Sequence, residues 1–458
     1  MATTPLPARD RAVVVGASMA GLLAARVLAD HFSEVVLIER DQLPEGAENR
    51  RAVPQGRHLH SLLGRGDEIL RELFPGIRDD FAAAGAESAL STREVRFVTE
   101  HGPLRQVDVT DPALCATRPL IESVVRQRVL DLQGVVARDA TDVTGLIAGD
   151  DGRIRGLTIF PHAEGAESEL AADLVVDASG RSGRSVAWLD ALRYGRPPEQ
   201  TIQSDLAYAS RRYRLAGSPG TDRFIVVTAQ PERPLGMAAG IVEEDSWVVT
   251  MFGYGRHRPS AAEEDFLPQL AAIAPPDLVA ALRDGEPLGP VEIHRTPTSI
   301  WRRYETMRRF PRGLLVFGDA LCAFNPIYGQ GMTVAAQQAL ALRAWLASGN
   351  DDPRAFFRLA RPAVKGAWDI VAGADLSIPE VAGPRPVPVR VVGKYMSRLQ
   401  AAAVDDEVVA TAYFRVLNLL DPPSALLRPG IGLRVARHAL RPNRAPARLP
   451  QTEPAVGN

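Results

Sequence analysis

The chain has 458 residues, 46% of them hydrophobic, and a formal net charge of −2 at pH 7. This balance excludes the broad basic surface that nucleic-acid binding needs, and the apolar content excludes a disordered chain. Cys115 and Cys322 are the only cysteines, too few for a disulfide framework or a cysteine-ligated zinc cluster, so we expect a reducing cytoplasm.

The N-terminal stretch RDRAVVVGASMAGLLAARVLA combines basic residues with an apolar run, as a signal peptide does. Gly16, Ser18 and Gly21 interrupt the run, and a second strand follows it directly, so we reject that interpretation. No other segment approaches the roughly 18 uninterrupted apolar residues that a membrane span needs. We therefore expect no transmembrane segment.

The same stretch predicts a strand, a glycine turn, a helix and a second strand, at residues 12–15, 16–21, 22–31 and 34–38. Glu39 ends the second strand. This is the order of a dinucleotide-binding βαβ unit, in which Gly16 permits the tight turn and Gly21 the close packing of helix on strand. The pyrophosphate would bind at the helix N-terminus and Glu39 would bind ribose hydroxyls. Ser18 replaces the middle glycine of the usual fingerprint.

Apolar and polar residues alternate in several runs of residues 205–256, which is the period of antiparallel strands with one buried face. We interpret this region as a substrate domain and expect pieces of residues 93–109 to join its sheet. Residues 261–285 predict two helices, separated by Pro275 and Pro276.

The stretch GDALCAFNPIYGQGMTVA, at 318–335, follows an apolar strand predicted at 313–317. Asp319 would lie at the carboxyl end of that strand, where open α/β sheets bind ligands, and could accept hydrogen bonds from a polyol. Pro326 turns the chain, Gly329 and Gly331 leave the backbone bare, and a helix begins near Met332. The positive end of that helix would favour the negative charge of a reduced isoalloxazine ring.

The two glycine motifs together resemble the FAD-dependent monooxygenases of the aromatic-hydroxylase fold. The 318–335 stretch is especially similar to squalene epoxidases and to the flavin epoxidases of polyether pathways, and RRAVPQGRHLH at 50–60 resembles the latter. The resemblance implies an α/β fold: an FAD-binding βαβ (Rossmann-like) domain, interleaved with an antiparallel-sheet substrate domain and followed by a C-terminal helical region.

The resemblance also implies the domain limits and the cofactor site. The FAD-binding parts would be 1–90, 118–200 and 293–354, the substrate domain 91–117 and 201–292, the helical region 355–445 and a disordered tail 446–458. The residues expected to bind FAD are Gly16, Ser18, Ala20, Gly21, Glu39, Arg40, Arg51, Arg118, Asp319, Pro326, Gly329, Gly331 and Met332. Arg51, rather than Arg50, matches the family's position. Arg118 is equally well interpreted as a solvated helix-start residue.

Other chemistry-bearing residues have plainer interpretations. His58 and His60 have no matching cluster of metal ligands nearby, so packing at the surface or near the flavin is favoured over a metal site. Cys322 is interpreted as a packing residue. Asp177 and Gly180 are an interrupted form of the family's Asp-Gly pair, which weakens the case for direct nicotinamide binding. The basic helix around Arg434 is a solvated or cavity-covering helix, with a membrane surface as the alternative.

The resemblance implies a flavin monooxygenase that epoxidises or hydroxylates a small lipophilic intermediate of polyketide or terpenoid type, in secondary metabolism. NAD(P)H or a separate flavin reductase would supply electrons. A redox-neutral, decalin-forming cyclase with a structural FAD is the alternative, because both functions would keep the FAD motifs. A flavin halogenase is disfavoured, because no lysine precedes Lys365 and a WxWxIP motif is absent. The motifs name no catalytic acid or base.

Overall fold

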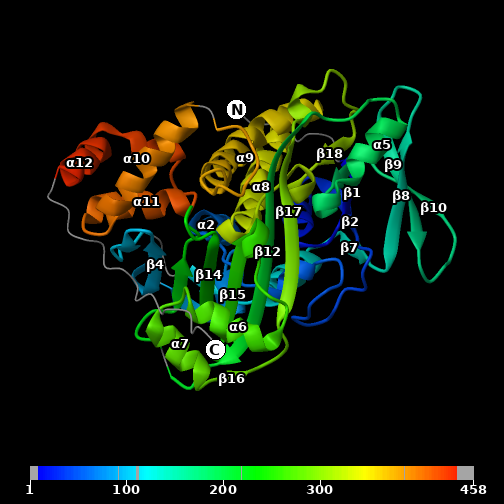
Figure 1. Cartoon of the computed structure of the whole chain (residues 1–458). Coiled ribbons are helices and arrows are strands. Elements are labelled where there is room, and N and C mark those ends of the chain that lie inside the picture. Colours follow the sequence, from blue (N-terminus) through cyan, green and yellow to red (C-terminus); the bar gives the residue numbers. More distant parts are fainter. Residues whose placement is uncertain (1–8, 91, 110–112, 218, 386, 441–458) are drawn as a thin grey trace.

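The structure is a computed structural model that describes residues 9–90, 92–109, 113–217, 219–385 and 387–440. It contains a parallel sheet, a large and mostly antiparallel sheet, and a C-terminal group of helices, which confirms the predicted fold. The C-terminal helices and a small sheet lie at opposite ends of the molecule (Figure 1). The tail expected at 446–458 lies outside the described residues.

The parallel sheet has the strand order β18-β11-β1-β2-β7. Its strands are β1 (Arg9–Val15), β2 (Phe32–Ile38), β7 (Val135–Arg138), β11 (Leu174–Asp177) and β18 (Leu314–Val316). Val15 pairs with Asp177, and Asp177 pairs with Val316, so β1, β11 and β18 end side by side. The loops after these strands, distant in sequence, therefore meet at one edge of the sheet, where open α/β sheets bind ligands.

Several helices and a two-stranded sheet belong to the same part of the chain as the parallel sheet. They are α1 (Met19–Leu28), α2 (Gly64–Leu73), α3 (Ile77–Ala83), α4 (Arg118–Leu130), α5 (Arg184–Ala191), α8 (Gly331–Ala347), β3 (Glu87–Leu90) and β6 (Ala113–Cys115). Helix α1 begins at Met19, earlier than the predicted Leu22, because the turn that Gly16 permits is complete by Ser18. The small sheet consists of β8 (Thr141–Ala148), β9 (Ile154–Pro161) and β10 (Ser168–Ala171).

The large sheet has the order β19-β17-β12-β15-β14-β13-β4-β5, with β16 on β12. Its strands are β4 (Val95–Thr99), β5 (Gly102–Pro103), β12 (Glu199–Arg214), β13 (Phe224–Val227), β14 (Leu235–Val242), β15 (Ser246–Tyr254), β16 (Glu286–Pro287), β17 (Glu292–Arg302) and β19 (Cys322–Ala323). Strands β4 and β5 join the sheet, as the pattern at 93–109 predicts. The sheet continues to Arg302, because β17 pairs along β12.

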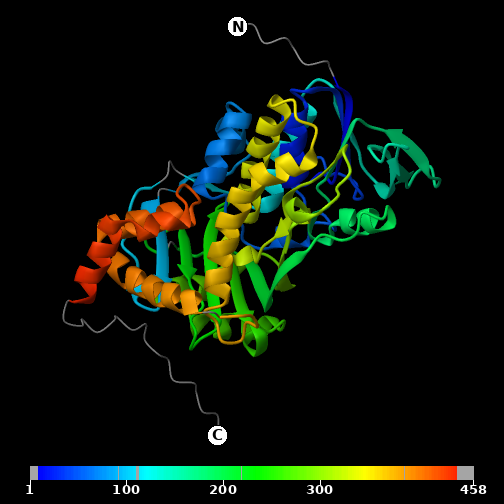
Figure 2. The ribbon, with the colours of Figure 1, turned by 90° about the horizontal axis from the view of Figure 1, so that it is seen from above.

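Two helices, α6 (Glu263–Ala271) and α7 (Pro276–Arg283), pack on the large sheet and are separated as the two prolines predict. The C-terminal helices are α9 (Pro353–Asp375), α10 (Val387–Ala403), α11 (Glu407–Leu417) and α12 (Pro429–Ala439). Helices α10 to α12 share a buried apolar cluster with Leu104 and Val107. Figure 2 shows them beside β4, at one end of the large sheet. Within the described ranges, no helix is long and apolar enough to span a bilayer.

Candidate flavin site and adjoining cavity

The first glycine loop brings α1 close to the strands. Gly16 has a φ of +102°, and a Cβ there would lie 2.6 Å from the carbonyl oxygen of Ala178, after β11. A Cβ on Gly21 would overlap the carbonyl oxygen of Gly16. Ser18 is the N-cap of α1 but makes no side-chain capping bond, so the positive end of the helix remains open to an anion.

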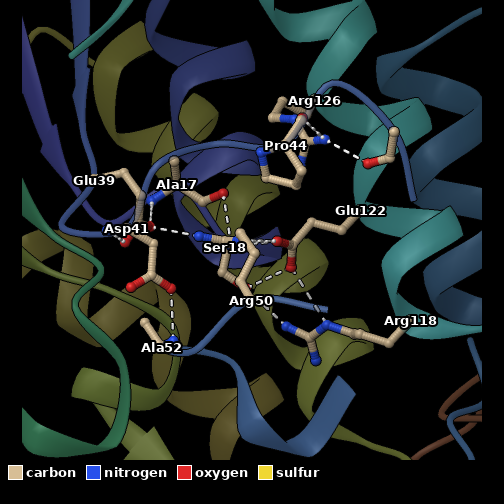
Figure 3. A network of polar contacts seen from close by, with 11 residues as sticks. Ala17, Ser18, Glu39, Asp41, Pro44, Arg50, Ala52, Arg118, Glu122 and Arg126 are labelled. Carbon is tan, nitrogen blue, oxygen red and sulfur yellow. Dashed lines mark hydrogen bonds and ion pairs between the residues drawn. The ribbon is translucent and has the colours of Figure 1, made fainter. Parts of the chain in front are cut away.

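The serine that replaces the fingerprint glycine has two partners on α4. The Ser18 hydroxyl donates to Glu122 Oε2 at 2.7 Å and accepts from Arg118 Nη2 at 2.8 Å. Arg118 and Glu122 are four residues apart, the spacing that places two side chains on one helix face. Helix α4 thus holds the start of α1 through a serine that a glycine could not replace (Figure 3).

Arg50 is the buried cation of this network. It forms an ion pair with Glu39 Oε2 at 2.9 Å, and its Nε donates to Glu122 Oε1 at 3.0 Å. Glu39 also accepts the backbone N–H of Ala17 at 2.9 Å. Burial alone would raise the pKa of Glu122, but the guanidinium groups of Arg118 and Arg50 lower it below its ordinary value. Figure 3 shows these side chains turned toward one another beside the first glycine loop.

The arginines next to these positions lie elsewhere. The side chains of Arg40 and Arg51 are exposed, whereas Arg50 is 7% exposed. The structure thus brings Arg50 together with Glu39 and Arg118, and the expected contact of Arg51 with FAD stays a prediction. Sequence reasoning missed Glu122 as well, although its spacing from Arg118 was a signal that could have been used.

The second motif packs directly on the first. Gly318 has a φ of +63°, and a Cβ there would lie 2.5 Å from the Cβ of Ala20 in α1. Asp319 follows, and its half-buried carboxylate makes no hydrogen bond within the described part of the chain. Burial raises the pKa of Asp319, opposed by Arg181, Arg118 and Arg302. Asp319 thus offers unused acceptor oxygens beside the start of α1.

The segment from Asn325 to Gln330, called the flavin loop below, leads into α8. Pro326 begins a 3-10 turn, Pro326–Tyr328, and Gly329 has a φ of +65°. Gln330 is the N-cap of α8 and makes no side-chain capping bond, and Met332 is buried in the first turn. A Cβ on Gly331 would lie 3.9 Å from Asp319 Oδ1, so the positive end of α8 opens next to Asp319.

These residues fit FAD. The pyrophosphate suits the open N-terminus of α1, and the ribityl hydroxyls suit the unused oxygens of Asp319. The start of α8 offers backbone N–H groups, and Gln330 Oε1 and Thr333 Oγ1 are buried there without a hydrogen-bond partner. A buried polar atom without a partner is costly. Thr333 Oγ1 lies against Gly66 of α2, so only Gln330 Oε1 is placed to indicate a polar ligand.

A cavity of about 1090 Å³ adjoins the flavin loop, the large sheet and helices α9, α10 and α11. Aromatic side chains make up much of its wall, among them Phe97, Phe224, Phe252, Tyr413 and Phe414. The charged side chains that line it are Glu100, Asp369 and Lys394, which are exposed and therefore lie at its rim. No arginine of the described ranges lines it, although arginine is by far the commonest basic residue of the chain.

Neutral polar groups occupy one wall of the cavity. His58 Nδ1 lies 2.7 Å from the hydroxyl of Ser210, and the His58 ring is 5.7 Å from that of His294. Burial, assisted by His294 and Arg57, lowers the pKa of His58 to about 4, and burial also lowers the pKa of His294. Burial and Arg118 lower the pKa of His60 to about 3, so these histidines are neutral at pH 7. The described residues contain no group of metal-ligating side chains.

Two further residues of the sequence analysis have structural contacts. Asp177 is fully buried and accepts the backbone N–H of Ser185 at 2.8 Å and that of Ser179 at 3.0 Å. It therefore holds the loop after β11 in place. Cys322 is buried in β19, and burial raises the pKa of its thiol well above the ordinary value, as suits a packing residue.

Comparisons with known proteins show the family of the chain. Residues 10–351 match the family described as FAD binding domain. The chain is 35% identical over 451 residues to Protein Rv3254 of Mycobacterium tuberculosis, covering 94% of each chain. It is 26% identical over 361 residues to a kynurenine 3-monooxygenase of Salinispora tropica, covering 75% of this chain and 74% of that one.

The p-nitrophenol 4-monooxygenase PnpA from Pseudomonas putida has a similar structure, with a TM-score of 0.64 and 16% identity. The superposition covers 90% of this chain and 99% of that one, and identity at this level shows a shared fold. The match to the FAD family covers both glycine motifs and ends just after α8, the helix that follows the second motif. The chain therefore belongs to the FAD binding domain family and is related to monooxygenases.

Proposed function

We propose that the protein is a flavin-dependent monooxygenase, an epoxidase or hydroxylase, that acts on a neutral lipophilic substrate of polyketide or terpenoid type. The observation that carries this proposal is the cavity beside the flavin loop. Its volume of about 1090 Å³ suits a sizeable ligand, and its interior is apolar, with charged groups only at the rim. The squalene-epoxidase-like motifs at 318–335 are in keeping with it.

Bound FAD, once reduced, would supply the activation of O₂. This chain's own residues would hold the substrate against the flavin loop and exclude water, through aromatic side chains such as Phe97, Phe252 and Phe414. The N-terminus of α8 would stabilise negative charge on the flavin by about 0.3–2 kcal/mol. NAD(P)H or a separate flavin reductase would provide the electrons.

The absence of a buried cation in the described cavity wall separates this proposal from the activity named for one relative. Kynurenine is an amino acid, and its carboxylate would be buried without a counter-charge in this cavity. We expect kynurenine to bind at least tenfold more weakly than a neutral aromatic ligand of similar size in equilibrium dialysis. Equal binding would show that the cavity carries a cationic contact that the proposal lacks.

The reaction type is tested with FAD-loaded protein that is photoreduced and then given a candidate lipophilic alkene or phenol under ¹⁸O₂. The proposal expects a product that carries one ¹⁸O atom. The control is the oxidised protein under strict anaerobiosis, which should leave the substrate unchanged. An isomer of unchanged mass, formed at full rate in the control, would replace the monooxygenase by a redox-neutral cyclase.

A further inference from the structure

A buried carboxylate outside the flavin motifs joins the flavin loop to the C-terminal helices. Asp375 is the last residue of α9 and is fully buried. Its Oδ1 accepts from the hydroxyl of Tyr328 at 2.8 Å, from that of Tyr254 at 2.9 Å and from Asn325 Nδ2 at 3.0 Å. These partners come from β15 and the flavin loop, so three separate parts of the chain converge on one oxygen atom.

This carboxylate lies in an unfavourable place. Within the described residues it forms no ion pair, and its Oδ2 has no hydrogen-bond partner. It also lies at the negative end of a 23-residue helix. Burial raises the pKa of Asp375 to about 6. Because a neutral side chain would avoid these costs, an uncompensated buried acid directly behind two tyrosines that line the cavity indicates a functional role.

The carboxylate determines which way its neighbours donate. An ionised carboxylate has no proton, so the hydroxyls of Tyr254 and Tyr328 must donate to Asp375. Both tyrosines also line the cavity, and with their protons turned to Asp375 their oxygens can only accept further hydrogen bonds. Tyr208, another lining residue, likewise donates to Asn325 Oδ1 at 3.3 Å. The three tyrosine hydroxyls therefore present hydrogen-bond acceptors, and no donor, to a ligand in this part of the cavity.

We propose that Tyr254 and Tyr328 form a recognition site for a hydroxyl group on the lipophilic substrate, and that Asp375 is the positioning residue that makes their oxygens acceptors. The site selects a ligand that donates a hydrogen bond and disfavours the same ligand with its hydroxyl blocked. The proposal rests on the proposed use of the cavity for a neutral substrate and names one group that this substrate carries.

The test is a binding measurement on oxidised, FAD-loaded protein without any reductant. The probes are 2-naphthol and 2-methoxynaphthalene, in which a methyl group replaces the hydroxyl hydrogen. Equilibrium dialysis with fluorescence detection gives the dissociation constant of each. At pH 7.5 we expect 2-naphthol to bind about fivefold to tenfold more tightly, the range of one hydrogen bond. Asp375→Asn and Tyr328→Phe should each reduce this ratio toward one.

The matched control is Tyr413→Phe. Tyr413 lines the same cavity, but its hydroxyl accepts from Gln400 Nε2 at 2.8 Å and makes no contact with Asp375. The control should keep the ratio of the parent protein. The flavin absorbance spectrum of each variant shows that it remains folded and loaded.

The pH dependence gives a readout that a purely structural role would not produce. The titratable groups that face Asp375 are Tyr254 and Tyr328, with Tyr208 next to them, and none of these changes charge near neutral pH. The 2-naphthol preference should therefore fall as the pH is lowered through about 6, where Asp375 gains its proton, and should be flat in Asp375→Asn. The parent protein alone provides this test if the variant fails to fold.

The outcomes separate the two proposals. If both naphthalenes bind equally to the parent protein, or if Asp375→Asn and Tyr328→Phe keep the parent ratio, the hydroxyl site is refuted and the lipophilic cavity stands. If neither naphthalene binds, the cavity does not take neutral aromatic ligands, and the proposed function fails together with the hydroxyl site.

Discussion

Gly16→Ala tests whether the first glycine loop holds α1 against the strands as the structure shows. Two costs arise there. The φ of +102° is unfavourable for alanine by about 1–2 kcal/mol. The new Cβ would also lie 2.6 Å from the carbonyl oxygen of Ala178, where ordinary contact begins at 3.4 Å. Relief of such an overlap costs about 1–3 kcal/mol more, so we expect a total destabilisation of about 2–5 kcal/mol.

Gly102→Ala is the matched control, because Gly102 has a φ of +105° and no atom within 4 Å of a Cβ placed there. It isolates the backbone cost of about 1–2 kcal/mol. The assay is thermal unfolding of the FAD-free protein, where about 2 °C of midpoint corresponds to 1 kcal/mol, followed by titration with FAD. Gly16→Ala should unfold several degrees lower than the control and bind FAD more weakly.

Two results would refute this reasoning. Equal unfolding midpoints for Gly16→Ala and Gly102→Ala would mean that the approach of Gly16 to Ala178 is looser than the structure shows. A Gly16→Ala variant that is destabilised but binds FAD with the affinity of the parent protein would show that the start of α1 does not contribute to the nucleotide site.

Three further predictions concern buried charges. Asp319→Ala should weaken FAD binding by about 1.5–3 kcal/mol in a titration, whereas Asp177→Ala should mainly lower the unfolding midpoint, because Asp177 holds the loop after β11. Arg50→Met should cost about 3–5 kcal/mol in urea unfolding of the FAD-free protein, because it leaves Glu39 buried without its cation and Glu122 with Arg118 alone; no loss would contradict the network. Asp375 keeps its proton up to about pH 6 in the folded state, whereas its ordinary pKa is 3.8. The free energy of unfolding of the parent protein, relative to that of Asp375→Asn, should therefore fall by about 3 kcal/mol as the pH rises from 3 to 7. Unfolding free energies that change with pH in parallel in the two proteins would refute the burial of this carboxyl.

The sequence by itself predicted the features that follow from local patterns. A buried β-branched run, a glycine turn and an apolar helix predict the βαβ unit because hydrophobic period and turn chemistry act over a few neighbouring residues. The same local logic predicted the strand before Asp319 and the helix that begins at Gly331, and the parallel sheet confirms that fold.

The tertiary structure alone decided which distant side chains meet. Arg50 and Arg51 are adjacent and chemically identical, and only the path of the chain after β2 places Arg50 between Glu39 and Glu122 while Arg51 faces solvent. Strand β17 joins the large sheet by pairing with β12. The two strands are far apart in the sequence, so no local hydrophobic period encodes this pairing.

Asp375 is the clearest case of this division. In the sequence it is one acid at the end of a helical pattern, indistinguishable from a solvated residue. Its burial and its three donors arise only because α9, β15 and the flavin loop pack together. Local patterns report which residues prefer to be buried, whereas the pKa and partners of a charged group depend on the groups that the whole fold places around it.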